Sequence, residues 1–238
     1  MIDFFVEGLL SINKLLFNNL GLTIIFVGVA SRLAFHPLII SSLRYSKAAR
    51  DLKPKLDEIK RRYGKDVRKM ADEQSKAFKD AGVNPAAGAL GCLSLVVQLG
   101  VFFILFRALL HVIGSDINTG FLIWDLAQKD IYPFSGLPLP VPGFLITATA
   151  VLSLVQSKMM TPEESDKKGK DDKGDLTSMF ALQGPMVFMF PLIILISGTQ
   201  FPAGLVLYWL VITIFGIIQQ YQAVGIGGLR PWLKKLRK

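Results

Sequence analysis

Residues 20–40 read LGLTIIFVGVASRLAFHPLII, an apolar run that contains a single charged side chain, that of Arg32. A bilayer core about 30 Å thick is crossed by roughly 20 helical residues, so this run predicts a transmembrane helix. An arginine inside such a helix costs about 2.5–3.5 kcal/mol on insertion scales and should face water or a partner rather than lipid. The run therefore predicts a membrane protein with a polar feature inside its first crossing.

The rest of the chain repeats this apolar character. It has 238 residues, of which 51% are hydrophobic, and its mean hydropathy is +0.45, which favours a membrane protein over a soluble one. Further apolar runs predict a second transmembrane helix at 85–110, a third at 140–158, and a fourth and a fifth within 179–224. Together with 20–40, we expect five crossings.

The N-terminal stretch differs from these spans. Residues 1–19 carry Asp3, Glu7 and Lys14 among apolar side chains, which predicts an amphipathic helix lying in the outer interface. A cleavable signal peptide would begin with basic residues, whereas Lys14 here follows an acidic start. We therefore expect the first span to stay in the mature protein.

The net charge of +9 is concentrated on three segments. Of the 27 Lys and Arg residues, thirteen fall between residues 44 and 79, five between 158 and 173, and five between 230 and 238. Five spans put all three segments on one side, which the positive-inside rule makes cytoplasmic, whereas four or six spans would separate the tail from the first segment. The expected topology has the N-terminus outside and the C-terminus in the cytoplasm.

Residues 41–84, which follow the first span, are polar but keep apolar residues at helical spacing. Residues 63–66 break the pattern, Asp66 is suited to cap a second helix, and Pro54 should begin or kink the first. The pattern predicts an antiparallel helical hairpin in the cytoplasm. The alternative is a solvated linker with no role beyond joining two spans.

Two longer connections lie outside the spans. The extracytoplasmic loop at 111–139 contains Trp124, Tyr132 and Phe134, a composition that favours aromatic anchoring at the outer interface. The cytoplasmic linker at 159–178 mixes acidic and basic residues, so we assign it no structure.

The cytoplasmic tail at 225–238 is short and basic. Attraction to an anionic leaflet, about 1 kcal/mol for each basic residue near the surface, is enough to explain it. Binding to ribosomal RNA through the same phosphate electrostatics is the alternative. The residues assigned to this ribosome or lipid contact are Arg230, Lys234, Lys235, Arg237 and Lys238.

The sequence holds no constellation for catalysis or metal binding. His36 and His111 lie near opposite ends of different predicted spans, and no Ser, Cys or carboxylate accompanies either at a useful spacing. Cys92 is the single cysteine, so no internal disulfide forms and no metal-ligand spacing exists. We expect neither an enzyme nor a cofactor.

Polar side chains inside the predicted spans are the more informative feature. Besides Arg32 they include Gln98, Gln156 and Gln219, and no Asp or Glu lies within any predicted span. A water-filled cavity open toward the cytoplasm would solvate Arg32, so the sequence favours such a cavity. The alternative is an arginine that bonds to span carbonyls and glutamines for packing alone.

Several short motifs also follow one another in a specific order. They are Arg32 with Pro37-Leu38, Pro54-Lys55 through Tyr63 and Asp66, Gly82-Val83-Asn84-Pro85 with Gly91-Cys92-Leu93 and Gln98, Trp124-Asp125-Leu126 with residues 130–133, and Pro202-Ala203-Gly204 through Leu207-Tyr208-Trp209 to Gln219-Gln220. This series covers nearly the whole chain and resembles the YidC/Oxa/Alb family of membrane protein insertases. Gly100 departs from the family, which often has a proline there, and the large outer domain of some members is absent, so the resemblance is to a compact bacterial member.

The resemblance implies an all-α membrane protein with five transmembrane helices around a hydrophilic groove, a cytoplasmic antiparallel helical hairpin and an N-terminal interfacial helix. The residues that it places in the substrate-binding groove are Arg32, Gln98, Gln156, Trp209 and Gln219. The basic residues that we assign to a recruitment hairpin are Lys53, Lys55, Lys60, Arg61 and Arg62.

The implied function is that of a membrane protein insertase and chaperone that works without ATP. Arg32 would transiently hold an acidic residue of the substrate's outgoing tail, and the substrate's apolar segment would leave sideways into lipid. Expected partners are nascent or newly made membrane proteins and the lipid bilayer, with the ribosome and the Sec translocon as further candidates and no DNA. The expected location is the bacterial plasma membrane, because no organelle-targeting extension precedes Met1.

Two other classes of function stay open. A small-anion transporter or channel would use Arg32 to bind its solute, although such proteins often have repeated halves and the sequence has no internal repeat. A non-inserting assembly scaffold would assist another translocon. Insertion of a model substrate and solute flux, both with purified protein in liposomes, would separate the three.

Overall fold

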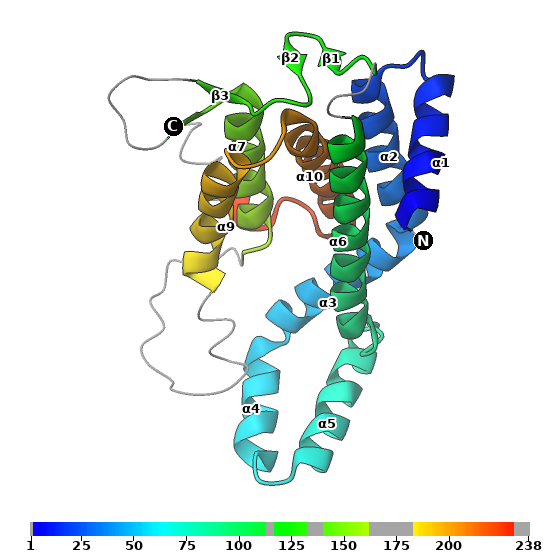
Figure 1. The fold of residues 1–238 in the computed structure, drawn as a ribbon. Coiled ribbons are helices and arrows are strands. Elements are labelled where there is room, and N and C mark those ends of the chain that lie inside the picture. Colours follow the sequence, from blue (N-terminus) through cyan, green and yellow to red (C-terminus); the bar gives the residue numbers. More distant parts are fainter. Residues whose placement is uncertain (1, 113–116, 133–139, 162–182, 231–238) are drawn as a thin grey trace. The chain divides into compact units, whose positions relative to one another are not determined.

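The computed structural model describes residues 2–112, 117–132, 140–161 and 183–230 (Figure 1). Within these residues the chain is mostly helical and divides into two compact units. The first comprises the chain up to Ala34 with Val96–Ser157 and Val187–Ile218, and the second comprises Phe35–Leu95, Lys158–Met186 and the chain from Gln219 onward.

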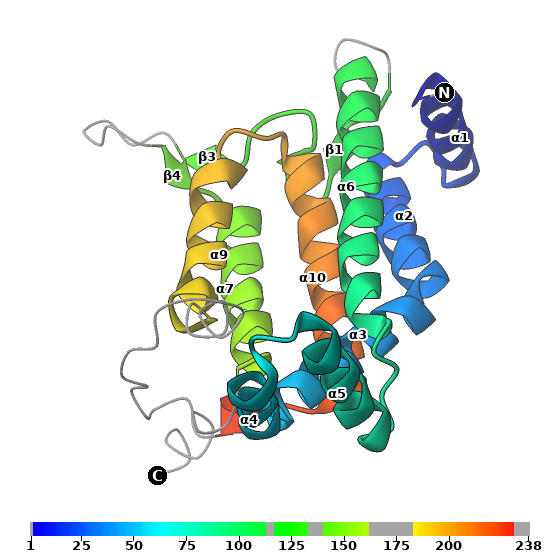
Figure 2. The ribbon, with the colours of Figure 1, turned by 90° about the horizontal axis from the view of Figure 1, so that it is seen from below.

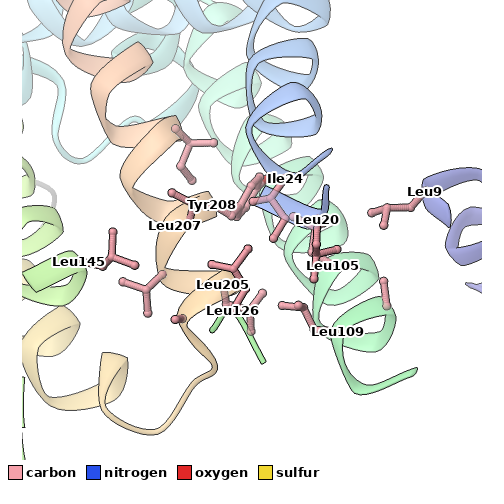
Figure 3. Close-up of a cluster of buried hydrophobic side chains, with 14 of the residues drawn as sticks. Leu9, Leu20, Ile24, Leu105, Leu109, Leu126, Leu145, Leu205, Leu207 and Tyr208 are labelled. Atoms are coloured by element: carbon pink, nitrogen blue, oxygen red, sulfur yellow. The ribbon is translucent and has the colours of Figure 1, made fainter. Parts of the chain in front are cut away.

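The first unit is built from helices that share one apolar core. Its elements are α1 (Ile2–Leu15), α2 (Leu20–Ala34) and most of α6 (Ala87–Val112), α7 (Phe144–Met159), α9 (Gln183–Gly198) and α10 (Ala203–Val224). In this unit α2, α6 and α10 run side by side in both views (Figures 1 and 2). Their large side chains meet in the core shown in Figure 3, among them Leu20, Ile24, Leu105, Leu109, Leu205 and Tyr208.

Close packing of the helix backbones holds this core together. A Cβ added at Gly204 of α10 would lie 3.0 Å from Leu109 and 3.1 Å from Ile24, and one at Gly28 of α2 would lie 2.9 Å from Val211. Lipid tails are as apolar as leucine, so helix association in a bilayer depends on such close approach rather than on removing side chains from water.

α1 meets α2 at a sharp bend. The two helix axes differ by 115°, and Phe17 and Asn18 adopt positive φ in the turn between them. The Thr23 hydroxyl donates to Asn13 Oδ1 at 2.9 Å, which ties the two helices together in a buried position. Phe4 on α1 is 75% exposed, an exposure typical of an interfacial helix. The interfacial position of residues 1–19 stays a prediction.

Four strands of two residues each interrupt the helical pattern. β1 (Gly120–Phe121) pairs with β2 (Trp124–Asp125), and β3 (Ile131–Tyr132) pairs with β4 (Val141–Pro142), both antiparallel. The all-α prediction omits these strands, because pairs this short leave no periodicity in the sequence.

The segment between the two strand pairs accepts hydrogen bonds from the first backbone N–H groups of α10. Ala203 N donates to Gln128 O at 2.6 Å, and Gly204 N donates to Leu126 O at 3.0 Å. The first four N–H groups of a helix lack partners within the helix, and two of them are satisfied here by the loop backbone.

Asp130 fixes the start of α7 in a similar way. Its Oδ2 accepts a hydrogen bond from Ile146 N, and its Oδ1 accepts one from Trp124 Nε1, both at 3.2 Å. Asp130 is buried, and a negative charge is stabilised at the positive end of a helix dipole. The Trp124 ring also stacks on Phe144, with 6.0 Å between ring centroids. Trp124, expected as an interfacial anchor, therefore packs against the start of this helix.

The second unit contains α3 (His36–Asp51), α4 (Lys53–Tyr63), α5 (Val67–Asp80), the beginning of α6 and the short 3-10 helix η1 (Gly227–Leu229). The helix predicted over 20–40 is not continuous, since α2 ends at Ala34 and α3 begins at His36. Pro37 lies in the first turn of α3. A proline ring clashes with the carbonyl four residues earlier and disfavours helical geometry in the residue before it, so the helix breaks here.

Within the hairpin predicted at 41–84, α3 occupies the beginning, and α4 and α5 lie on either side of the predicted break at 63–66. α4 and α5 lie side by side and antiparallel (Figures 1 and 2), with Pro54 in the first turn of α4. Asp66 is the N-cap of α5, and its side chain accepts a hydrogen bond from Lys69 N at 3.1 Å. Phe78 of α5 packs on Ala48 and Ala49 of α3 in a small apolar cluster.

The helix lengths in the structure identify fewer membrane-spanning helices than the five apolar runs of the sequence predict. Among the described residues, α10 alone is long and apolar enough to cross a bilayer by itself, and α1 with α2 passes the same criterion only as a bent pair. The described apolar parts of α6, α7 and α9 are shorter, at Val96–His111, Phe144–Met159 and Val187–Gly198. Five crossings stay a prediction.

Some predictions concern residues outside those that the structure describes. They include Phe134 of the loop, most of the linker at 159–178, and the tail residues Lys234, Lys235, Arg237 and Lys238.

Candidate functional site

Arg32 lies in the last turn of α2, half-buried in the first unit. The sequence placed it in the interior of a longer helix, but the break before Pro37 puts it at a helix C-terminus. The last four carbonyls of a helix have no partner within the helix, and the end carries a partial negative charge. The position therefore stabilises a cation without requiring a carboxylate nearby.

Gly216 of α10 brings Arg32 and Gln156 together. A Cβ built on Gly216 would lie 3.4 Å from Arg32 Nη2 and closer still to Gln156 Nε2. The Arg32 guanidinium from α2 and the Gln156 carboxamide from α7 thus both lie against α10 at Gly216. Two of the predicted groove residues are brought together in this way.

Gln98 of α6 reaches the same unit's α10 through Tyr208. Gln98 Nε2 donates a hydrogen bond to the Tyr208 hydroxyl, which also interacts with Ser31 of α2. Ser31 donates in turn to Gly28 O at 2.8 Å. Tyr208 is completely buried and interacts electrostatically with Arg32, so this chain of polar groups and the Arg32 side chain belong to one cluster.

The Trp209 side chain packs among aromatic residues rather than in the polar cluster around Arg32. Its ring stacks on Phe102 of α6 at 5.7 Å and meets the edge of Phe201 at 6.0 Å. Consecutive residues on a helix are separated by about 100°, so Tyr208 and Trp209 cannot face the same neighbours. Sequence reasoning chose Trp209 and passed over Tyr208, although the position of Tyr208 one turn after Gly204 was available as a signal.

Gln219 lies in the second unit. Its Nε2 donates to His36 Nδ1 at 2.9 Å, and its side chain is buried. The structure therefore gives this predicted groove residue a partner on α3.

Arg107 is a further basic residue that sequence reasoning missed. It lies on α6 inside the second predicted span, and its side chain is exposed. Its position within 85–110 was the signal that could have found it.

The polar cluster of Arg32, Gln156, Gln98, Tyr208 and Ser31 offers hydrogen-bond donors and one fixed positive charge. A guanidinium carries five N–H donors in a planar fork that suits a carboxylate. Within the described ranges, no group of three or more His, Cys, Asp or Glu side chains is placed to hold a metal ion. The arrangement suits binding of an anionic group rather than bond cleavage.

The hairpin of the second unit carries its charges on the surface. Lys55 pairs with Asp80 across the two helices at 3.7 Å, and Arg62 pairs with Glu58 on α4. Lys53 and Arg61 are also exposed, and Lys60 is half-buried. Arg230, the described member of the predicted tail contact, is exposed beyond η1.

A cavity of about 440 Å³ lies in the second unit between α3 and the turn after α5. His36, Ser41 and Arg44 line one wall, and Gly82 and Asn84 line the other. Farther along α3, burial raises the pKa of the Tyr45 hydroxyl. Burial also lowers the pKa of the Arg50 guanidinium, and the nearby charge of Asp51 partly offsets that lowering.

The chain is similar to known proteins over most of its length. A sequence profile of the family described as 60Kd inner membrane protein matches residues 12–225. The chain is 34% identical over 206 residues to a protein of Magnetococcus marinus named membrane protein insertase YidC, an alignment that covers 86% of this chain and 32% of that protein. The chain spans about a third of the length of that relative.

Two shorter relatives are covered more fully. Identity is 30% over 223 residues with the membrane protein insertase YidC of Alkalihalophilus pseudofirmus, covering 91% of this chain and 77% of that protein. It is 30% over 216 residues with the membrane protein insertase MisCA of Bacillus subtilis, covering 89% and 73%.

Proposed function

The chain belongs to the family of the 60Kd inner membrane protein, and from that premise we propose that it inserts other proteins into a membrane and helps them fold, without ATP. The relatives named insertases and the polar cluster around Arg32 both support this function. The observation that carries the proposal is the convergence of the Arg32 guanidinium and the Gln156 amide on one point above Gly216.

The physical task of an insertase is to move a polar segment across the hydrocarbon core. Each backbone group that loses its hydrogen bonds there costs several kcal/mol. In this proposal the half-buried side chains of Arg32, Gln98 and Gln156 line a wet path partway across, which shortens the dry distance. The substrate's own apolar segment then enters lipid, where its burial supplies the driving force at about 25 cal/mol per Å².

Arg32 receives an acidic residue of the substrate's outgoing tail. Gln156 lies near its guanidinium beside Gly216, and Gln98, Tyr208 and Ser31 form a chain of polar groups on the adjoining helices. Water in the path weakens the ion pair, because the attraction of two charges falls as the effective dielectric rises. The pair is therefore strong enough to guide the tail and weak enough to release it.

The remaining assignments concern topology and recruitment. We place five crossings in a bacterial plasma membrane, with the N-terminus outside and the C-terminus in the cytoplasm. The hairpin of α4 and α5 then meets nascent chains and their delivery partners in the cytoplasm, and the exposed side chains of Lys53 and Arg61 support this role. The basic tail from Arg230 contacts ribosomal RNA or anionic lipid.

The test uses purified protein in liposomes and two model substrates that differ only in the outgoing tail, one acidic and one neutral. Arg32→Ala should lower insertion of the acidic-tail substrate about tenfold, as expected if about 1.4 kcal/mol of transit stabilisation is lost. Arg32→Lys should keep much of the activity because it keeps the charge. Lys76→Ala, which breaks an exposed ion pair with Glu73, is the matched control and should act like wild type.

Two results would overturn the proposal. Equal insertion of the acidic-tail substrate by wild type and Arg32→Ala would remove the charge role. Solute flux without insertion by the wild-type protein would instead favour an anion transporter.

A further inference from the structure

We infer that Gly216 is a positioning residue of the Arg32 site: its missing side chain leaves the space in which the Gln156 amide sits beside the guanidinium. This inference rests on the proposed function and names a residue that determines how Arg32 meets an acidic tail. Nothing in the sequence singled out Gly216, which lies within a continuous apolar helix.

The contacts of Gly216 are polar, unlike those of other helical glycines in the first unit. A Cβ at Gly216 would collide with Gln156 Nε2 and lie 3.4 Å from Arg32 Nη2. A Cβ at Gly204 would instead meet only the apolar side chains of Leu109 and Ile24. At Gly100 of α6, no atom lies within 4 Å of the added Cβ.

The two polar contacts are of different severity. The approach to Arg32 Nη2 is an ordinary van der Waals distance, whereas the approach to Gln156 is too short for any side chain to be added without movement. A methyl group at Gly216 therefore displaces the Gln156 amide first. The guanidinium then loses its neighbour on α7 while its own charge and helix are unchanged.

Helix propensity works against a glycine at this position. Glycine in a helix interior is less favourable than alanine, because its backbone loses more freedom on folding. An alanine that fits should therefore leave stability unchanged or raise it, as we expect at Gly100. At Gly216, the ends of the Gln156 and Arg32 side chains lie where a larger side chain would go, which explains a glycine there despite its low helix propensity.

The experiment measures insertion of the acidic-tail and neutral-tail substrates by the full chain in liposomes, together with thermal stability in detergent. Gly216→Ala should lower the ratio of acidic-tail to neutral-tail insertion about threefold to tenfold, the range expected when one polar group beside the charge is displaced. Gly204→Ala should lower stability and reduce insertion of both substrates in parallel. Gly100→Ala should match wild type in both measurements.

A second variant covers the case in which Gly216→Ala does not fold. Gln156→Leu keeps the bulk of the side chain and removes its amide, so it should lower the same ratio while the protein stays folded. An unchanged ratio in Gly216→Ala, or in Gln156→Leu where the first variant fails to fold, would overturn the inference. So would a parallel loss of both substrates, as in Gly204→Ala.

Arg32→Ala separates this inference from the function on which it rests. If Arg32→Ala leaves the ratio at the wild-type value, the charge role itself is wrong. If Arg32→Ala lowers the ratio and Gly216→Ala does not, the function stands and the positioning role of Gly216 fails.

Discussion

Arg32 in the first unit and Arg62 in the second carry the same guanidinium in opposite settings. Arg32 is half-buried at the end of an apolar helix, against Gln156 and Gly216. The Arg62 side chain is 66% exposed and pairs with Glu58 one turn earlier on α4. A charge inside a membrane helix costs several kcal/mol, whereas an exposed helical ion pair is worth about 0.3–0.5 kcal/mol.

This difference indicates that half-buried charges, rather than exposed ones, are the better candidates for functional residues. Most of the basic residues fall in three polar segments of the sequence, of which the hairpin is one, and their distribution predicts topology. In the first unit, Arg32 and Gln156 lie near Gly216 of α10, and Gln98 bonds to Tyr208 of α10, so these polar side chains meet groups from other helices. Burial, rather than number, should therefore decide how much a substitution costs.

Two carboxylates on one short segment of the first unit give the largest expected contrast. Asp130 is buried and accepts hydrogen bonds from Trp124 Nε1 and Ile146 N. Asp130→Ala leaves both donors without their acceptor at the start of α7. Because hydrogen bonds to charged groups are worth about 1.5–3 kcal/mol, the free energy of unfolding should fall by about 3 kcal/mol, measured by denaturation in detergent.

Asp125 is the matched control because it is exposed. It accepts hydrogen bonds from Ala127 N and Gln128 Nε2, both at 3.0 Å, and Asp125→Ala should cost less than about 1 kcal/mol. Its bond with Thr119, followed by that with Ala127, holds the Asp125 pKa below 3.8. A lowered carboxyl pKa gives stability that is present near neutral pH and lost as the pH falls through that pKa. Equal losses for the two variants would contradict the contrast.

The sequence predicted the helices better than it predicted their ends and partners. Hydropathy located the helical regions because apolar runs are a local property, and Pro54 and Asp66 marked the hairpin helices because capping is also local. The break before Pro37 was missed, since an apolar run continues through it to Ile40. That break moves Arg32 from a helix interior to a helix end.

The candidate site was only partly predictable for the same reason. Polar residues inside apolar runs drew attention to Arg32, Gln98 and Gln156, which the structure places in one unit. Which face of α10 meets them depends on helix rotation, and a single sequence does not contain that angle. Tyr208 and Gly216 were therefore missed.

The N-cap of α5 gives an intermediate effect in the second unit. The Asp66 side chain accepts a hydrogen bond from Lys69 N and satisfies one of the free donors at the helix start. Asp66→Ala should lower the free energy of unfolding by about 1 kcal/mol, with Asp66→Ser recovering most of it because serine also caps well. Hydrogen exchange of the α5 amides is the measurement. Loss of protection throughout the first unit's core would show that the cap has a wider role than this.

The smallest effect is expected for Arg62→Ala, which completes the comparison with Arg32. Its exposed pair with Glu58 should contribute about 0.3–0.5 kcal/mol at low salt. In 1 M salt the screening length falls to about 3 Å, so the difference in thermal stability between Arg62→Ala and wild type should shrink toward zero. A difference that persists in high salt would instead come from the packing of the arginine stem, as long basic side chains also cover apolar surface. In that case exposure alone would not explain why the two arginines differ.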